Sequence, residues 1–372
     1  MSKAAELAAL IGSQSALSDR NMIINGAMQV AQRGTSSTGQ GASDLFLVDR
    51  FHLNTNGNSA GRFTVTQESN GPSDIPNSLK LDCTTADTSI AASERLFIEQ
   101  RLEGQNLQRM KKGTSDAQAI TVSFYVKGNA AATYVVGIFD SDNSRQIGAQ
   151  FSVTTDWNRV SVTFPGDTGG SPLDDDNAES LSLRFYLHAG STYTGGTLQT
   201  TWDTAVNNEQ VGSGTTSFFD STSRTFFLTG VQMELGEVAT PFEHRSFADE
   251  LYRCKRYFQK SFNYDTAPEN GGSSGVSFNG GLLSYCGSNN NGAFSGFHRF
   301  DPEMRATPTI TTFGNSSGHW GSLSPTNTGT TSFSSGAGFL TNTKASGVNF
   351  GQNVSGDTLL IGFGHLTADA EL

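Results

Sequence analysis

The chain has 372 residues and a net charge of −11, with only 16% charged and 35% apolar residues. This balance argues against a non-specific nucleic-acid binder, which needs a basic surface to neutralise phosphates. Compared with an ordinary globular protein, Gly, Ser, Thr and Asn replace part of the charged and apolar residues, and 26 of the aromatic residues are phenylalanine. We therefore expect a turn-rich β protein with a Phe-rich core, divided into two domains because the length is large for one core.

The cysteines give no sign of a covalent framework. Cys83, Cys254 and Cys286 are far apart and odd in number, so we expect buried free thiols and neither a disulfide network nor a zinc site. No stretch reaches membrane-spanning length, and the opening MSKAAELAALIG is too short and too rich in alanine for a signal peptide. These features predict a soluble chain that is made in the cytoplasm and does not insert into a membrane.

Residues 2–11 are predicted to form a brief helix. Leu7, Leu10 and Ile11 fall on one side of it, and Gly12 is placed to end it. A helix of this length is not stable alone in water. It should therefore pack on its own chain, on copies of itself or on a larger assembly.

From Asn21 to residue 245 the sequence shows the two-residue period of β-strands. ITVSFYVK (120–127), RVSVTF (159–164) and LSLRFYLH (181–188) each alternate apolar and other residues, which gives every strand one buried face. Further strands are predicted at 45–53, 62–68, 79–83, 96–102, 133–140 and 226–234. This number of one-sided strands without intervening helices indicates an antiparallel β-sandwich, and we expect a jelly roll.

The period changes in SFADELYRCKRYFQKS (246–261). Phe247, Leu251, Cys254 and Phe258 recur at steps of four, three and four, which predicts a helix with one apolar face. Ser246 can cap this helix, and its acidic and basic residues lie where the helix dipole favours them. The apolar face can pack around a common axis with copies of the chain, or dock on its own chain.

Residues 262–372 are predicted to form a second, smaller β domain. Turn-forming stretches such as GSNNNGAF surround strand candidates that include TPTITTF and TLLIGFGHL. The strand edges of such a domain are poorly protected in a monomer and are often completed by symmetry-related copies.

Catalytic motifs are weak in this chain. The sequence Gly271-Gly272-Ser273-Ser274-Gly275 matches a nucleophile elbow, but it lies in a polar turn cluster without the required strand and helix. FDSDNS (139–144) begins like a calcium loop and then departs from the pattern. A carboxylate pair for glycoside hydrolysis would come from distant positions, and nothing selects one. We therefore assign no catalytic residue and no cofactor.

The sequence leaves one possible metal site undecided. Asp174, Asp175 and Asp176 could hold a structural Ca²⁺ between loops, or could simply be solvated loop charges.

Several aromatic residues are candidates for ligand contact. Sugar rings stack their C–H faces on aromatic planes, so outward-facing rings are candidate glycan contacts, and the alternative is packing against a neighbouring loop or subunit. The candidate ligand-binding residues are Tyr186, His188, Tyr193, Trp202, His319 and Trp320.

Three stretches together resemble structural proteins of tailed bacteriophages. They are NMIINGAMQVAQRGTS (21–36) leading into DLFLVDRFHL, then TGVQMELGEVATPFEHRSFADELYRCKRYFQKS (229–261), and finally FDPEMRATPTITTFG (300–314) with the terminal GHLTADAEL. The resemblance spans most of residues 21–372 and leaves the first twenty residues outside it.

The resemblance implies a virion fibre or related appendage. It implies a jelly roll similar to carbohydrate-binding modules over 21–245, a linking helix over 246–261 and a β tip over 262–372. Residues 1–20 lie outside the resemblance, but the helix predicted there is too short to stand alone, so in a protein of this family we expect it to attach the chain to other virion proteins. The resemblance further implies a homotrimer that recognises host surface polysaccharide, without catalysis. The alternatives are a capsule polysaccharide depolymerase and a purely architectural collar, baseplate or head-decorating protein.

Overall fold

The computed structural model describes residues 19–57, 59–269, 282–285, 293–313, 319–324, 327–334, 340–353 and 361–372. As far as they are described, residues up to Ala31, Thr35–Phe247 and Leu372 form one compact unit, and Gln32–Gly34 with Ala248–Glu371 form a second. The predicted helix at 2–11 lies outside the described residues. Among the described helices, none combines the length and the apolar character needed to cross a membrane.

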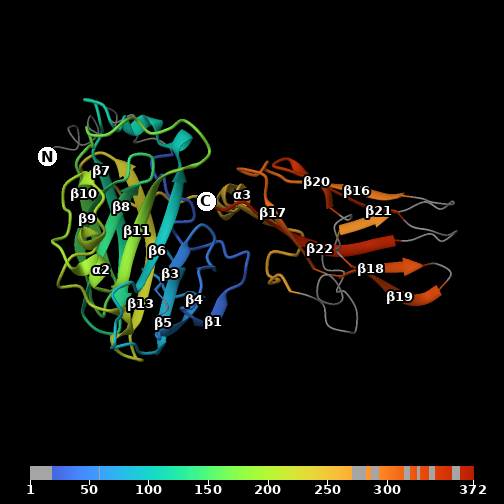
Figure 1. Cartoon of the computed structure of the whole chain (residues 1–372), viewed down its shortest axis with the longest axis horizontal. Helices are drawn as coiled ribbons and strands as arrows, with labels where there is room; N and C mark the ends of the chain where they lie inside the picture. The colour runs from blue at the N-terminus through green and yellow to red at the C-terminus, as the bar shows by residue number, and fades with distance from the viewer. Residues whose placement is uncertain are drawn as a thin grey trace. The chain divides into compact units, whose positions relative to one another are not determined.

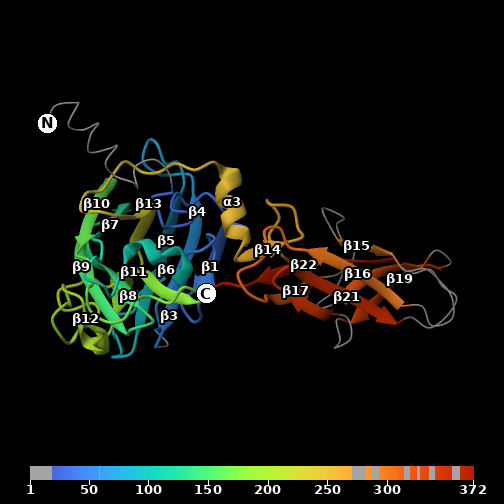
Figure 2. The same cartoon turned by 90° about the horizontal axis from the view of Figure 1, so that it is seen from above.

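The first unit is a β-sandwich of two antiparallel sheets, as expected for a jelly roll (Figures 1 and 2). Sheet A contains, in spatial order, β1 (Ser36–Gln40), β4 (Arg62–Glu68), β5 (Ser78–Thr85), β13 (Thr225–Leu235), β7 (Ile120–Gly128) and β10 (Asn158–Phe164). Sheet B contains β12 (Asp203–Thr204), β9 (Arg145–Val153), β8 (Ala132–Asp140), β11 (Glu179–Ala189), β6 (Arg95–Glu103), β3 (His52–Asn56) and β2 (Leu45–Phe46). Figure 2 shows the two sheets as separate layers within this unit.

Short helical turns connect the strands of the sandwich. They are η1 (Gly104–Asn106), η2 (Gln108–Met110), α2 (Ser191–Thr194), η3 (Asn207–Glu209) and η4 (Phe218–Asp220).

Phenylalanine dominates the interior, as the composition predicts. Among the described residues, nine of the eleven largest fully buried side chains are phenylalanines. The ring of Phe124 on β7 meets Phe151 at 5.0 Å and Phe185 at 4.9 Å, both edge to face. These contacts join sheet A to sheet B, and such ring pairs stabilise a fold by about 0.5–1.5 kcal/mol each beyond their buried area.

The sequence predicts one continuous strand at 45–53, and this prediction is wrong. The structure splits it into β2 and β3 around a buried turn at Leu47–Phe51, in which Arg50 has φ +71°. The Arg50 guanidinium donates a hydrogen bond to the carbonyl of Arg101 at 2.6 Å. A buried turn reads like a strand in the sequence because both are apolar runs. Strands β1, β9 and β12 have no counterpart among the predicted strands of this unit.

The Asn-Gly pair near the start of the sandwich has a structural role. Asn25 is fully buried with φ +61°, a conformation that asparagine tolerates. Its side-chain amide donates to the carbonyls of Val30 and Asp49, both at 2.9 Å. A side chain at Gly26 would clash with the carbonyl oxygen of Val231. This pair therefore fixes a buried turn near the start of the sandwich against β13.

The second unit is also mostly β. One sheet contains β14 (Phe258–Lys260), β22 (Ile361–Asp369), β18 (His319–Ser324) and β19 (Asn327–Ser334), and β15 (Leu282–Tyr285) and β17 (Thr309–Phe313) also pair with β22. A three-stranded sheet contains β16 (Ala293–Arg299), β21 (Gly347–Asn353) and β20 (Leu340–Lys344). A small core forms around Phe300, Met304 and Leu366.

The helix predicted over 246–261 is shorter than expected. Helix α3 spans Phe247–Lys255, and Phe258 begins β14, which pairs with β22. Phe258 is therefore not a member of a helical stripe. Strand pairing with the distant C-terminal strand outweighs the local helical period, which the sequence alone cannot reveal.

Three residues from the N-terminal region belong to the second unit. The side-chain amide of Gln32 donates to the carbonyl of Phe258 at 2.9 Å. The Arg33 guanidinium lies 3.8 Å above the Phe258 ring and 3.0 Å from the carboxylate of Asp369. The Gln-Arg-Gly stretch therefore completes the second unit, which is discontinuous in sequence.

Candidate functional site

The outer face of sheet B does not expose the predicted aromatic residues. Tyr186 on β11 and Tyr193 on α2 are 5% and 9% exposed, and they pack with Phe97, Val135 and Val211. In Figure 1, α2 lies over the face of this sheet. The expectation that Tyr186 and Tyr193 are exposed is wrong, because the segment that follows β11 folds back and packs its own Tyr193 and Val211 with Tyr186.

His188 is also buried, at 2% exposed, which contradicts its predicted outward position. One ring nitrogen lies 2.8 Å from the Ser217 hydroxyl and the other 3.2 Å from a carboxylate oxygen of Glu94. Burial lowers the pKa of His188, and the Glu94 carboxylate offsets this only in part. His188 is therefore a hydrogen-bonded interior residue.

Trp202 is half-buried and already partnered. Its indole N–H donates to the carbonyl of Pro165 at 2.8 Å, and the Lys112 ammonium lies 5.5 Å from the ring centre. His319 and Trp320 contribute backbone to β18, and their side chains lie outside the described residues. Of the six predicted ligand residues, Trp202 is thus the one with a described and partly accessible side chain.

The outer face of sheet A carries a different aromatic group. Strand register aligns Lys80 of β5 with Phe227 of β13, and Phe227 with Lys127 of β7. Trp157 directly precedes β10, whose Asn158 pairs with Val126, so Trp157 comes next to Lys127. We call these four residues, Lys80, Phe227, Lys127 and Trp157, the lysine–aromatic row.

Phe227 forms the floor of the lysine–aromatic row. It is 7% exposed, and the ammonium groups of Lys80 and Lys127 each lie 5.5 Å from its ring centre. Trp157 meets Phe227 edge-on, with 6.0 Å between ring centres and an interplanar angle of 72°. The Lys127 ammonium is also 5.9 Å from the Trp157 ring, and Lys80, Lys127 and Trp157 stay partly exposed.

The sequence contains only a partial signal for this row. The alternation in ITVSFYVK places Lys127 on the outward face, but Phe227 and Trp157 come from segments far away in the chain. Trp157 lies in the turn between β9 and β10, and β9 was not predicted. Only the strand order brings the three segments together.

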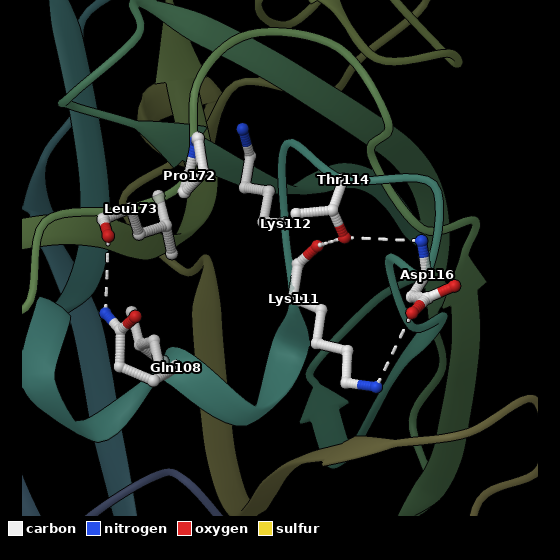
Figure 3. A pocket seen from close by; sticks show the side chains of 8 residues that line it. Gln108, Lys111, Lys112, Thr114, Asp116, Pro172 and Leu173 are labelled. Atoms are coloured by element: carbon white, nitrogen blue, oxygen red, sulfur yellow. Dashed lines mark hydrogen bonds and ion pairs between the residues drawn. The ribbon is translucent and has the colours of Figure 1, made fainter.

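A pocket of about 330 Å³ opens elsewhere on the first unit (Figure 3). It is lined by Leu107, Gln108, Lys111, Lys112, Thr114, Asp116, Pro172 and Leu173. Its polar groups already have partners within the chain. Lys111 and Asp116 lie 3.8 Å apart, and the Gln108 amide donates to the Leu173 carbonyl at 3.3 Å. The Lys112 ammonium points away from the Lys111–Asp116 pair (Figure 3). The pocket therefore offers little unpaired charge to a ligand.

Lys112 belongs to a buried ion network. Its ammonium contacts the carboxylates of Asp140 and Asp167, the latter at 2.9 Å, and all three side chains are at most 2% exposed. The Arg145 guanidinium binds Asp167 with two hydrogen bonds of 2.8 and 2.9 Å. Burial alone would raise the pKa of Asp167, but the hydrogen bonds from Arg145 and Lys112 lower it. This network neutralises two interior carboxylates with protein cations.

A second network surrounds Glu99 on β6. Its carboxylate accepts from a His52 ring nitrogen at 3.0 Å and lies 2.8 Å from Arg101 and 3.1 Å from Arg184. Burial would raise the pKa of Glu99, but His52, Arg184 and Arg101 together hold it at about 2. Glu99 is therefore ionised near neutral pH and unsuited to act as a general acid.

Metal ligands do not gather in the described part of the chain. Asp174, Asp175 and Asp176 are all exposed. Within the residues that the structure describes, no three His, Cys, Asp or Glu side chains cluster as a metal site would require. The GGSSG stretch at 271–275 lies outside the described residues. Cys83 and Cys254 are buried and form no disulfide, as expected, and Cys286 lies outside the described residues.

The proposed oligomer face of α3 is only partly available. Cys254 is fully buried and Phe258 is 4% exposed in the single chain. Leu251 is half-buried, and Phe247 is 43% exposed. Any contact between copies through this stripe therefore depends on Phe247 and Leu251.

No protein-family model and no curated protein matches the sequence. Among solved structures, one described as "CBM4 structure and function" is 13% identical, covers 57% of this chain and 98% of its own, and gives a TM-score of 0.30. A putative sugar binding protein from Bacteroides thetaiotaomicron is 15% identical over 58% of this chain and 100% of its own, with a TM-score of 0.32. The enzymatically active domain of tailspike protein 4 from bacteriophage CBA120 is 14% identical over 58% of this chain and 21% of its own, with a TM-score of 0.29. TM-scores this low assign neither a family nor a ligand to the chain.

Proposed function

We propose that the chain is a non-enzymatic structural component of a tailed-phage particle, of the fibre type, and that it binds glycans on the host surface. The three sequence stretches that resemble such proteins support the particle role, and so does the arrangement of a sandwich followed by a second β unit. Residues 1–20 attach the chain to other virion proteins in this proposal. We expect mass spectrometry to detect the chain in purified phage particles. Its absence from them would contradict the particle role.

The observation that carries the glycan role is the lysine–aromatic row. The partly exposed indole of Trp157, held edge-on against the buried Phe227 ring, offers an apolar surface to the C–H face of a sugar ring. The ammonium groups at its rim can donate hydrogen bonds to sugar oxygens. Such a platform needs no catalytic group, in keeping with a binding protein.

Trp157→Ala should weaken glycan binding about tenfold or more, because the variant loses the largest partly exposed ring of the row. Binding of soluble protein to purified host surface polysaccharide measures this by affinity electrophoresis. Phe297→Ala is the matched control, since it removes a 59% exposed ring from β16 in the other unit. Equal affinities of the two variants would show that the row does not bind the glycan, and shortening of the polysaccharide would indicate a depolymerase.

The proposal includes a homotrimer. Light scattering should therefore give a solution mass of three times 39.5 kDa. Leu251→Asp should then release monomers, because a charge would enter the shared apolar stripe of α3. Tyr252→Asp, at the neighbouring position that is 53% exposed, should leave the mass unchanged. A Leu251→Asp protein that keeps the trimeric mass would remove α3 from the oligomer contact.

A further inference from the structure

We propose that the lysine–aromatic row selects acidic saccharides, in which a sugar carboxylate or sulfate pairs with Lys127 while its ring stacks on Trp157. This inference rests on the proposed glycan role and narrows it to a ligand class. It concerns the outer face of sheet A, whereas the predicted ligand residues Tyr186, His188 and Tyr193 lie buried on or against sheet B.

The two lysines of the row differ in their electrostatic surroundings. Lys80 lies 2.9 Å from a carboxylate oxygen of Asp82 and 3.6 Å from one of Glu68, so its charge is already balanced. Lys127 contacts the rings of Phe227 and Trp157, and no carboxylate of the described residues lies within ion-pair distance of it. Lys127 is thus a cation held by aromatic faces, with its charge available to an incoming anion.

The position of Lys127 suits a ligand that is both apolar and anionic. Its ammonium lies 5.5 Å from the ring centre of Phe227 and 5.9 Å from that of Trp157, so it flanks both rings. The next row of the same face contributes Arg159, which is exposed and lies 5.9 Å from the ring centre of Tyr125. Its guanidinium also donates hydrogen bonds to the Ser123 hydroxyl and the Thr240 carbonyl, which leave its charge uncompensated. A uronic acid or sulfated sugar offers a C–H face for the ring and an anion for the ammonium within one residue.

The length of the row also suits a short oligosaccharide. From β5 across β13 and β7 to the start of β10 there are three strand-to-strand steps. At the usual spacing between strands these steps span about 14 Å. The row therefore accommodates more than one sugar unit, with Lys80 and Lys127 at different points along it.

The negative net charge of the chain bears on the role of the Lys127 ammonium. The protein carries a net charge of −11, so its general electrostatic field repels acidic polymers. An anionic glycan that binds must therefore find local compensation, and Lys127 and Arg159 supply it on one face. A neutral glycan would need neither of these charges.

The experiment compares acidic polysaccharides with their neutralised forms, using the full-length chain. The probes are polygalacturonate, alginate and heparin, each beside a carboxyl-reduced or desulfated preparation, and neutral galactan. Affinity electrophoresis at low and moderate salt reports binding. We expect at least one acidic polymer to bind about tenfold more tightly than its neutralised form, with an affinity that falls as salt rises.

Lys127→Met tests the residue itself. Methionine keeps an unbranched apolar side chain at this position and removes the charge, so the fold should be retained and the preference for the acidic form lost. Lys127→Arg should keep most of that preference. Lys111→Met is the matched control, since it removes the same charge from a side chain that is 56% exposed at another place.

The outcomes separate this inference from the glycan role. Equal binding of acidic and neutralised polymers, or unchanged binding by Lys127→Met, would overturn the acidic preference. If Trp157→Ala still lost binding in that case, the glycan role would stand. A wild-type chain that binds no polymer, acidic or neutral, would contradict both.

Discussion

Lys112→Met should lower the free energy of unfolding of the first unit by about 3–5 kcal/mol, the usual result of removing one partner from a buried ion network. The variant leaves Asp140 and Asp167 close together in the interior. Asp167 keeps its two hydrogen bonds from Arg145, but Asp140 keeps only the amide donors of Asn143 among its described partners. Chemical denaturation of the full chain, followed by tryptophan fluorescence, measures the change.

The adjacent lysine gives a close control for this experiment. Lys111 is exposed and lies 3.8 Å from an exposed Asp116, so Lys111→Met should change the stability by no more than about 0.5 kcal/mol. Adding Asp140→Asn to Lys112→Met should recover part of the loss, because the buried unpaired carboxylate becomes neutral. If Lys112→Met were as stable as Lys111→Met, the network would not contribute as described.

Glu99→Gln should destabilise the sandwich by about 3 kcal/mol at pH 7, because the folded state holds the pKa of Glu99 at about 2 against an ordinary 4.5. A folded pKa below the unfolded one stabilises the protein at pH values above 4.5. This contribution declines as the pH falls from 4.5 towards 2, where both states become protonated. The difference between Glu99→Gln and wild type should therefore shrink to about 1 kcal/mol at pH 3.

Denaturation midpoints at pH 7 and pH 3 test this dependence. Glu68→Gln is the control, because Glu68 is an accessible partner of Lys80 at 3.6 Å and its loss should have a small effect at both pH values. A Glu99→Gln difference that is the same at pH 7 and pH 3 would mean that His52, Arg101 and Arg184 do not hold the carboxylate ionised.

The strand pattern was largely predictable where a strand has one buried face. Inward residues of β7, β10 and β11 follow the two-residue period, because alternate side chains must point to opposite sides of a sheet. The pattern gave a wrong prediction at Leu47–Phe51, because a buried turn there has the same apolar residues as a strand. It was also wrong at Phe258, which pairs with β22 as a strand and does not continue the helix.

The candidate site was not predictable to the same degree. Tyr186 and Lys127 both occupy outward positions of their strands, so the period does not distinguish them. Tyr186 is covered by the segment that carries Tyr193 and Val211, whereas Lys127 stays partly exposed beside Trp157. Which outward residues meet solvent depends on where distant loops fold back.

By itself, the sequence determined a β-rich chain with a Phe-rich core, the inward faces of its clearest strands and the short helix near 247, because these depend on local period and composition. Only the tertiary structure decided that Phe227, Lys127 and Trp157 share one face, and that Lys112 neutralises Asp140 and Asp167. These groups come from segments that lie far apart in the chain, and strand order and loop packing, which local sequence does not encode, bring them together.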